Sequence, residues 1–107
     1  NHNAPGLVGL EAALAYLQSE TIERLRDREA ELTGRLVEGL RSITRVTVYG
    51  HASPETPHVG VVSFNIEGFA SHEAASILDE SFQIMARAGL HCAAGAHRWL
   101  GTLDQGG

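Results

Sequence analysis

The spacing of the apolar residues changes near residue 45, and this change restricts the folds open to the chain. Before it, leucines recur every three or four residues from Leu7 to Leu17, and a longer amphipathic pattern runs from about Glu20 to Arg41. Such spacing predicts two helices, each with one apolar stripe. Asn3 is expected to cap the first helix, with Pro5 in its first turn, and Ser19 to cap the second.

Beyond this point the apolar residues alternate with polar ones, which is typical of strands. Strands are expected over Arg45–Gly50 and Val59–Glu67, joined by a loop that contains two prolines. A helix capped by Ser71 then runs to about Ser81, and a third strand covers Ile84–Ala88. This order predicts an α+β fold, a two-layer domain in which helices cover an antiparallel or mixed three-stranded sheet.

The apolar faces of the three helices are the expected core. The chain has 107 residues, enough for one domain with a modest core. The residues expected to be buried are Leu7, Leu10, Leu14, Leu17, Ile22, Leu25, Leu32, Leu36, Leu40, Ile43, Ala74, Ile77 and Leu78.

Composition excludes several classes of function. Thirteen acidic residues against eight basic ones give a net charge of -5, so no basic excess favours nucleic acid. No apolar run is long enough to span a membrane. One cysteine cannot form an internal disulfide, and a reducing, cytoplasmic compartment is the expectation.

The candidate chemistry lies between Arg87 and Gly101. This stretch holds the only cysteine, Cys92, on a glycine-punctuated loop with His91 and His97 nearby. The thiolate is the nucleophilic form of cysteine, and either imidazole could favour it or carry its proton. The structural alternative is that His97 and Trp99 only pack the short helix expected after the loop, and for Trp99 that alternative is favoured.

Two segments carry a family resemblance. The stretch "RAGLHCAAGAHRWLGT" (87–102) resembles the active-site cysteine segment of the cysteine desulfurase and selenocysteine lyase branch of the class V aminotransferases. The opening "NAPGLVGLEAALAYL" (3–17) resembles a helix start, N-x-P-G-x-x-G-L-x-A-A-L, of the same family. These are fold-type I pyridoxal-phosphate enzymes, and their small domain has an α+β fold.

The resemblance implies specific roles and partners. Cys92 matches the nucleophile that takes sulfur from L-cysteine, or selenium from selenocysteine, leaving alanine. Asn3 falls at the edge of the cofactor site of the dimer in these enzymes. The resemblance further implies a homodimeric parent enzyme and a sulfur-acceptor protein as partner.

All eight basic residues are arginines, so the chain contains no lysine. A pyridoxal-phosphate enzyme holds its cofactor through a lysine amine. The resembled family carries that lysine upstream, in its large domain. We therefore expect residues 1–107 to be a single domain, the small C-terminal domain of a longer enzyme. By itself this piece is expected to be inactive and to lack the family's final strand.

Other readings stay open at this point. The parent could be a class V aminotransferase of another specificity, or the chain could be a non-catalytic α+β dimerisation or interaction domain. A zinc site drawn from His91, Cys92 and His97 lacks a suitably spaced fourth ligand, so no metal is expected. The other histidines (His2, His51, His58 and His72) are scattered and are expected at the surface. No signature supports a cysteine-histidine hydrolase.

Overall fold

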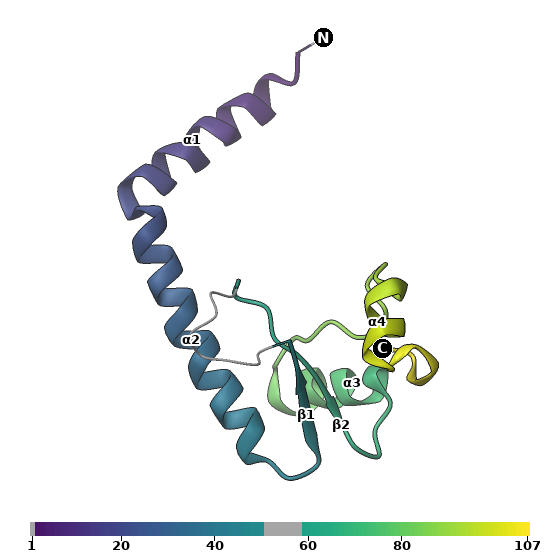
Figure 1. The fold of residues 1–107 in the computed structure, drawn as a ribbon. Helices are drawn as coiled ribbons and strands as arrows, with labels where there is room; N and C mark the ends of the chain where they lie inside the picture. The colour runs from purple at the N-terminus through teal and green to yellow at the C-terminus, as the bar shows by residue number, and fades with distance from the viewer. Residues whose placement is uncertain (1, 51–58) are drawn as a thin grey trace. The chain divides into compact units, whose positions relative to one another are not determined.

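The computed structural model describes residues 2–50 and 59–107, and the middle of the predicted loop lies outside them. The elements in chain order are α1 (Ala4–Glu20), α2 (Ile22–Ser42), β1 (Val46–Tyr49), β2 (Ser63–Ile66), α3 (Ser71–Phe82), α4 (Ala94–Leu100) and a 3₁₀ turn, η1 (Leu103–Gln105) (Figure 1). The chain divides into two compact units. One comprises the described parts of residues 1–39 and 50–62, and the other residues 40–49 and 63–107. No helix in the described ranges combines the length and apolar character that crossing a membrane requires.

The start of α1 confirms the predicted cap. The Asn3 side chain accepts a hydrogen bond from the Gly6 N–H at 3.1 Å, and Pro5 lies in the first turn. A Cβ atom on residue 6 would lie 2.5 Å from Nδ2, the side-chain amide nitrogen of Asn3. Gly6 is therefore the residue that leaves room for the capping side chain, which explains a glycine near the start of a helix.

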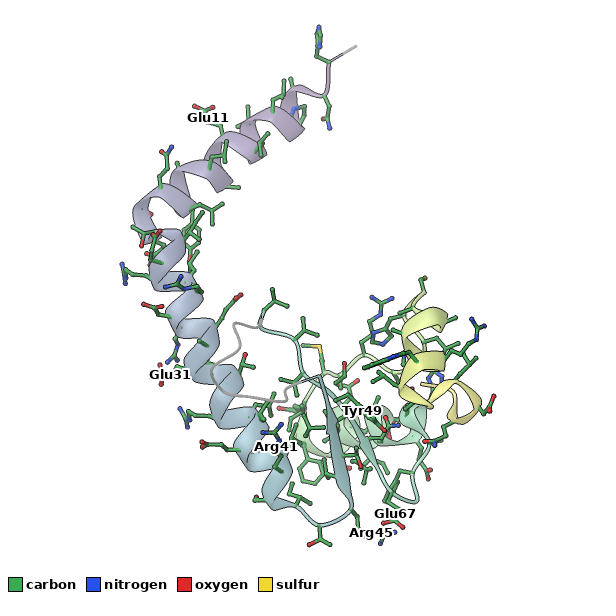
Figure 2. The ribbon with its side chains drawn as sticks, in the orientation of Figure 1. Glu11, Glu31, Arg41, Arg45, Tyr49 and Glu67 are labelled. Atoms are coloured by element: carbon green, nitrogen blue, oxygen red, sulfur yellow. The ribbon has the colours of Figure 1, made fainter. Side chains whose placement is uncertain are left out.

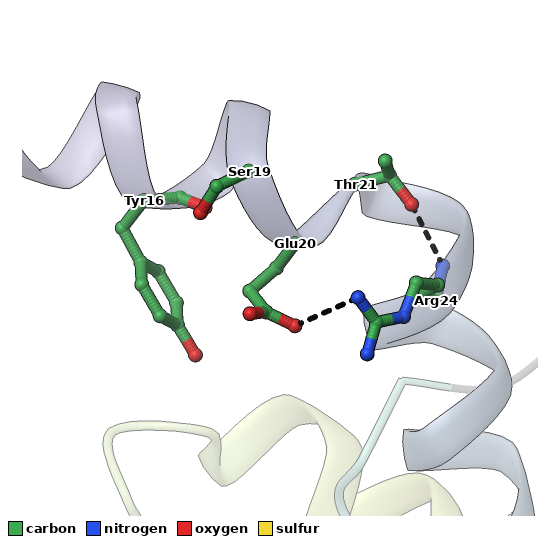
Figure 3. A network of polar contacts seen from close by, with 5 residues as sticks. All are labelled: Tyr16, Ser19, Glu20, Thr21 and Arg24. Atoms are coloured by element: carbon green, nitrogen blue, oxygen red, sulfur yellow. Dashed lines mark hydrogen bonds and ion pairs between the residues drawn. The ribbon is translucent and has the colours of Figure 1, made fainter.

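A single residue, Thr21, separates α1 from α2 (Figure 3). Its φ of 63° and ψ of 143° are rare for a β-branched residue. Its N–H donates to the Leu17 carbonyl, and its Oγ1 accepts from the Arg24 N–H at 3.3 Å. The predicted cap at Ser19 is wrong, because Thr21 has that role and the Ser19 hydroxyl bonds the Tyr16 carbonyl inside α1. Arg24 also pairs with Glu20 across the joint, at 3.4 Å.

Strands β1 and β2 pair antiparallel, from Val46 opposite Ile66 to Tyr49 opposite Ser63. The pairing ends at Arg45, where the Glu67 N–H donates to the Arg45 carbonyl at 2.8 Å and the Arg45 guanidinium bonds the Glu67 carbonyl at 3.1 Å (Figure 2). The second strand is shorter than predicted. Because β1 offers only four residues as partners, pairing cannot extend back to residue 59.

Helix α3 packs against β2, and the two form the two-layer α+β arrangement that the sequence predicts (Figure 1). Ala70 is its N-cap residue and makes no side-chain hydrogen bond, so the predicted cap at Ser71 is wrong. The predicted third strand is also absent from the described residues, where the sheet has two strands. The Ile84 N–H donates to the Leu78 carbonyl, and among the described residues no strand pairs with residues 84–88.

The three helices predicted from the spacing of apolar residues are confirmed, but most of the residues predicted to form the core are not buried. Val37 is the one buried apolar residue in the described ranges, and the leucine stripe of α1 is exposed from Leu7 to Leu17. Ile77 in α3 is 41% exposed. An apolar stripe becomes buried only when a second surface packs against it, and the sequence period does not say whether that surface belongs to the same chain.

Candidate active site

The cysteine lies in a tight turn from Leu90 to Ala93. The Ala93 N–H donates to the Leu90 carbonyl at 2.8 Å, and the two central residues, His91 and Cys92, have φ values of 49° and 61°. Positive φ at both central positions is the signature of a type I′ turn, in which asparagine and glycine are preferred. Non-glycine residues held there cost on the order of 1 kcal/mol or more each, and such outliers cluster at functional sites. The Cys92 thiol is free and exposed.

Helix α4 begins directly after the turn and ends in a Schellman motif. Gly101, with a φ of 74°, donates its N–H to the Arg98 carbonyl at 3.3 Å, and the Thr102 N–H donates to the His97 carbonyl at 2.9 Å. This pattern requires a left-handed residue after the helix, which glycine supplies without strain. It also brings the side chains of His97 and Thr102 together, because these are the positions that meet across a Schellman motif.

The His97 ring is held by a buried hydroxyl. Its Nδ1 lies 2.8 Å from Thr102 Oγ1, within hydrogen-bond distance. Thr102 is 3% exposed, the one buried polar residue in the described ranges, and the His97 side chain is half-buried. A buried hydroxyl needs a partner, and the imidazole is that partner here.

The residues after α4 return to the start of the cysteine turn. The Thr102 carbonyl accepts hydrogen bonds from the Gln105 and Gly107 N–H groups, at 3.1 and 3.2 Å. Gly107 packs directly on Gly89, since a Cβ atom on Gly107 would lie 2.6 Å from the Gly89 carbonyl carbon. The His72 ring of α3 also lies against Gly89, where an added Cβ would be 3.3 Å from its Cε1. Gly89, directly before the cysteine turn, is thus packed against both Gly107 and His72.

The structure brings together only part of the predicted site. His91 shares the turn with Cys92, and His97 lies one helical turn beyond Ala93, whose carbonyl accepts the His97 N–H at 3.1 Å. Within the described ranges no hydrogen bond joins Cys92 to either imidazole, and no group of three or more His, Cys, Asp or Glu residues is placed to hold a metal ion. Asn3 belongs to the other compact unit, where its side chain caps α1.

Trp99 differs from its predicted role, and Thr102 makes a contact that was not predicted. Trp99 is 86% exposed, so the prediction that it packs the short helix is wrong. Thr102 was given no role, although the Leu-Gly-Thr sequence that ends α4 contains the available signal. A glycine at this position predicts a Schellman motif, and the motif places the residue after the glycine beside the histidine.

The residues present do not fit covalent attachment of pyridoxal phosphate. The eight basic side chains are all arginines, so this chain offers no side-chain amine for a Schiff base. Among its reactive groups are the Cys92 thiol and the imidazoles of His91 and His97.

Comparison with known proteins places the chain in a family. The family model for class V aminotransferases matches residues 1–104. A probable cysteine desulfurase of Pyrococcus abyssi is 38% identical over 91 residues, covering 85% of this chain and 22% of that protein. One from Methanothermobacter thermautotrophicus is 34% identical over 105 residues, covering 98% of this chain and 26% of that protein.

A solved structure extends the comparison to the fold. The apo structure of cysteine desulfurase from Thermococcus onnurineus NA1 matches with a TM-score of 0.84 and 38% identity, over 92% of this chain and 24% of that one. This chain therefore spans about a quarter of the length of the relatives it matches. The family match over nearly the whole sequence and the agreement in fold lead to one conclusion: the chain belongs to the class V aminotransferase family and, within it, is similar to the cysteine desulfurases.

Proposed function

We propose that this chain is the small C-terminal domain of a longer pyridoxal-phosphate-dependent cysteine desulfurase, and that Cys92 receives sulfur from L-cysteine as a persulfide. The observation that carries the proposal is the position of Cys92. The thiol is free and exposed at the second central position of a turn whose backbone is unfavourable for cysteine. The relatives named cysteine desulfurase, each about four times as long as their match here, support the parent activity.

The exposure of the Cys92 thiol and the strained backbone of its turn both favour a reactive role over a structural one. A structural cysteine is usually buried and inert, whereas a nucleophile must meet its substrate. Cys92 meets this requirement, because its thiol is free and exposed. Holding Cys92 and His91 at positive φ costs folding free energy, and that cost is consistent with a side chain that is placed for reaction rather than for packing.

The reaction assigned to Cys92 is attack of its thiolate on the substrate sulfur. A sulfur–sulfur bond forms while the bond between the substrate sulfur and its carbon breaks. The electron pair of the broken bond stays with the substrate carbon, which gains a proton, so that alanine leaves. His91 and His97 are the histidines nearest in sequence to the thiol, and we assign them to thiolate formation and proton exchange.

The remainder of the longer enzyme supplies what this chain lacks. In this proposal it provides the lysine and the pyridoxal-phosphate site, and Asn3 lies at the edge of that site. A homodimer, a reducing cytoplasmic compartment and a sulfur-acceptor protein complete the proposal. The isolated residues 1–107 are accordingly inactive, because they contain no lysine.

The test uses the full-length parent enzyme, loaded with pyridoxal phosphate and given L-cysteine. Mass spectrometry of the peptide that contains Cys92 should show one added sulfur atom. Cys92→Ala should abolish the adduct and sulfide release without changing the cofactor absorbance, and Ser76→Ala, on the exposed surface of α3, is the matched control. Sulfide release by Cys92→Ala at the control rate would exclude Cys92 as the nucleophile. An amino-acid-dependent change in cofactor absorbance without any sulfur adduct would indicate a class V aminotransferase of another specificity.

A further inference from the structure

We infer that Thr102 is a positioning residue. By holding Nδ1 of His97, its hydroxyl fixes the imidazole so that Nε2 is the nitrogen that exchanges a proton during the reaction of Cys92. This inference rests on the proposed desulfurase function and assigns a role to Thr102, a residue that the proposed function does not use. It starts from the contact between Thr102 Oγ1 and His97 Nδ1, at 2.8 Å.

The first argument concerns the helix end where the two residues meet. A Schellman motif normally pairs apolar side chains at the two positions that His97 and Thr102 occupy. Its backbone hydrogen bonds, from Gly101 and Thr102 to the last turn of α4, do not involve the threonine hydroxyl. A valine would serve the helix end as well as threonine does, and would bury no polar group. The hydroxyl is therefore explained by the imidazole that it contacts and not by the helix.

The second argument concerns the rigidity of the hydroxyl. The Thr102 N–H donates to the His97 carbonyl, and the Thr102 carbonyl accepts from Gln105 and Gly107. Its side chain is buried, so the hydroxyl has a fixed place from which to hold the ring. A histidine held through one ring nitrogen keeps one ring orientation, and its other nitrogen is left for chemistry.

The third argument connects this pair to the cysteine. Backbone hydrogen bonds run from Leu90 to Ala93 across the turn, from Ala93 to His97 along α4, and from His97 to Thr102 at the helix end. Gly107 completes the path, because it bonds Thr102 and packs on Gly89, the residue before Leu90. The backbone around Cys92 and the helix that carries His97 therefore belong to one continuous set of contacts in one compact unit.

The experiment is a double-mutant cycle in the full-length, cofactor-loaded parent, with single-turnover persulfide formation on Cys92 as the rate. Thr102→Val keeps the shape of the side chain and the backbone bonds but removes the hydroxyl, and Thr102→Ser keeps the hydroxyl. We expect Thr102→Val to lower the rate about 10-fold with the KM for L-cysteine within about 2-fold, and Thr102→Ser to stay near the wild-type rate. His97→Gln should lower the rate at least as much, and adding Thr102→Val to it should cause no further loss.

A second readout does not depend on activity. Ring ¹⁵N chemical shifts of histidine-labelled parent enzyme should show a hydrogen-bonded Nδ1 for His97 in the wild type and in Thr102→Ser, and a shifted Nδ1 signal in Thr102→Val, where the hydroxyl partner is lost. If Thr102→Val does not fold, Thr102→Ala is measured in its place. A rate unchanged by loss of the hydroxyl, or an equal further loss in the His97→Gln background, would overturn the positioning role. Absence of the persulfide in wild-type enzyme would instead overturn the proposed function, so the two failures are distinguishable.

Discussion

Nδ1 of His97 lies 2.8 Å from the hydroxyl of Thr102, and the two side chains meet because Gly101 ends α4 in a Schellman motif. Gly101→Ala is therefore expected to act on both the fold and the site. Alanine at a φ of 74° costs about 1 kcal/mol. Thermal or urea unfolding of the parent enzyme should show that loss of stability. Gly95→Ala, inside α4 with open space around its Cβ position, is the control and should be neutral or stabilising.

The backbone of the cysteine turn gives a second prediction. His91 has a φ of 49°, which glycine adopts without strain, so His91→Gly should raise the free energy of unfolding by up to about 1 kcal/mol. Ala96→Gly, inside α4, should lower it by about 1 kcal/mol, as glycine does in ordinary helical positions. Equal destabilisation by both changes in urea titrations would contradict the strained turn.

The joint between the first two helices gives a third prediction. Thr21 Oγ1 accepts the Arg24 N–H at the start of α2 (Figure 3), so Thr21→Ala should lower the free energy of unfolding by about 1 kcal/mol. Thr33→Ala, in the middle of α2, removes a β-branched residue from a helix and should be neutral or slightly stabilising. If the two variants unfold at the same denaturant concentration, the capping role of Thr21 is wrong.

The ion pair at the end of the hairpin is predicted to contribute little to the free energy of unfolding. Arg45 and Glu67 form an ion pair at 3.6 Å, but their side chains are 60% and 75% exposed. Exposed pairs of this kind contribute little, so Glu67→Gln should change the free energy of unfolding by less than about 0.5 kcal/mol. The bond from the Arg45 guanidinium to the Glu67 carbonyl is to the main chain and survives the change. A loss above about 1 kcal/mol, or a strong dependence on salt, would contradict this account.

The features that local sequence encodes were predicted well. Asn3 and Pro5 mark the start of α1, and the helical spacing of apolar residues gave α1, α2 and α3 to within about two residues. The α+β class followed from the order of these patterns. The sequence singles out Cys92 by its uniqueness and its flanking histidines, and its catalytic role stays a prediction.

What depends on contacts distant in sequence was predicted less well. Residues 84–88 have a strand-like composition, yet a strand needs a neighbour, and none lies beside them in the described ranges. Trp99 is apolar enough for a core, but whether it is covered depends on surfaces that its own helix does not determine. The contact between His97 and Thr102 is different, because the two residues are close in sequence and the glycine after α4 already predicts that they meet.

The most direct test of the central claim is the mass of the Cys92 peptide after the full-length, pyridoxal-phosphate-loaded parent enzyme has reacted with L-cysteine. The proposed function predicts a gain of one sulfur atom on Cys92 that dithiothreitol removes and that Cys92→Ala lacks. An unmodified Cys92 peptide from an enzyme that still produces alanine from L-cysteine would contradict it.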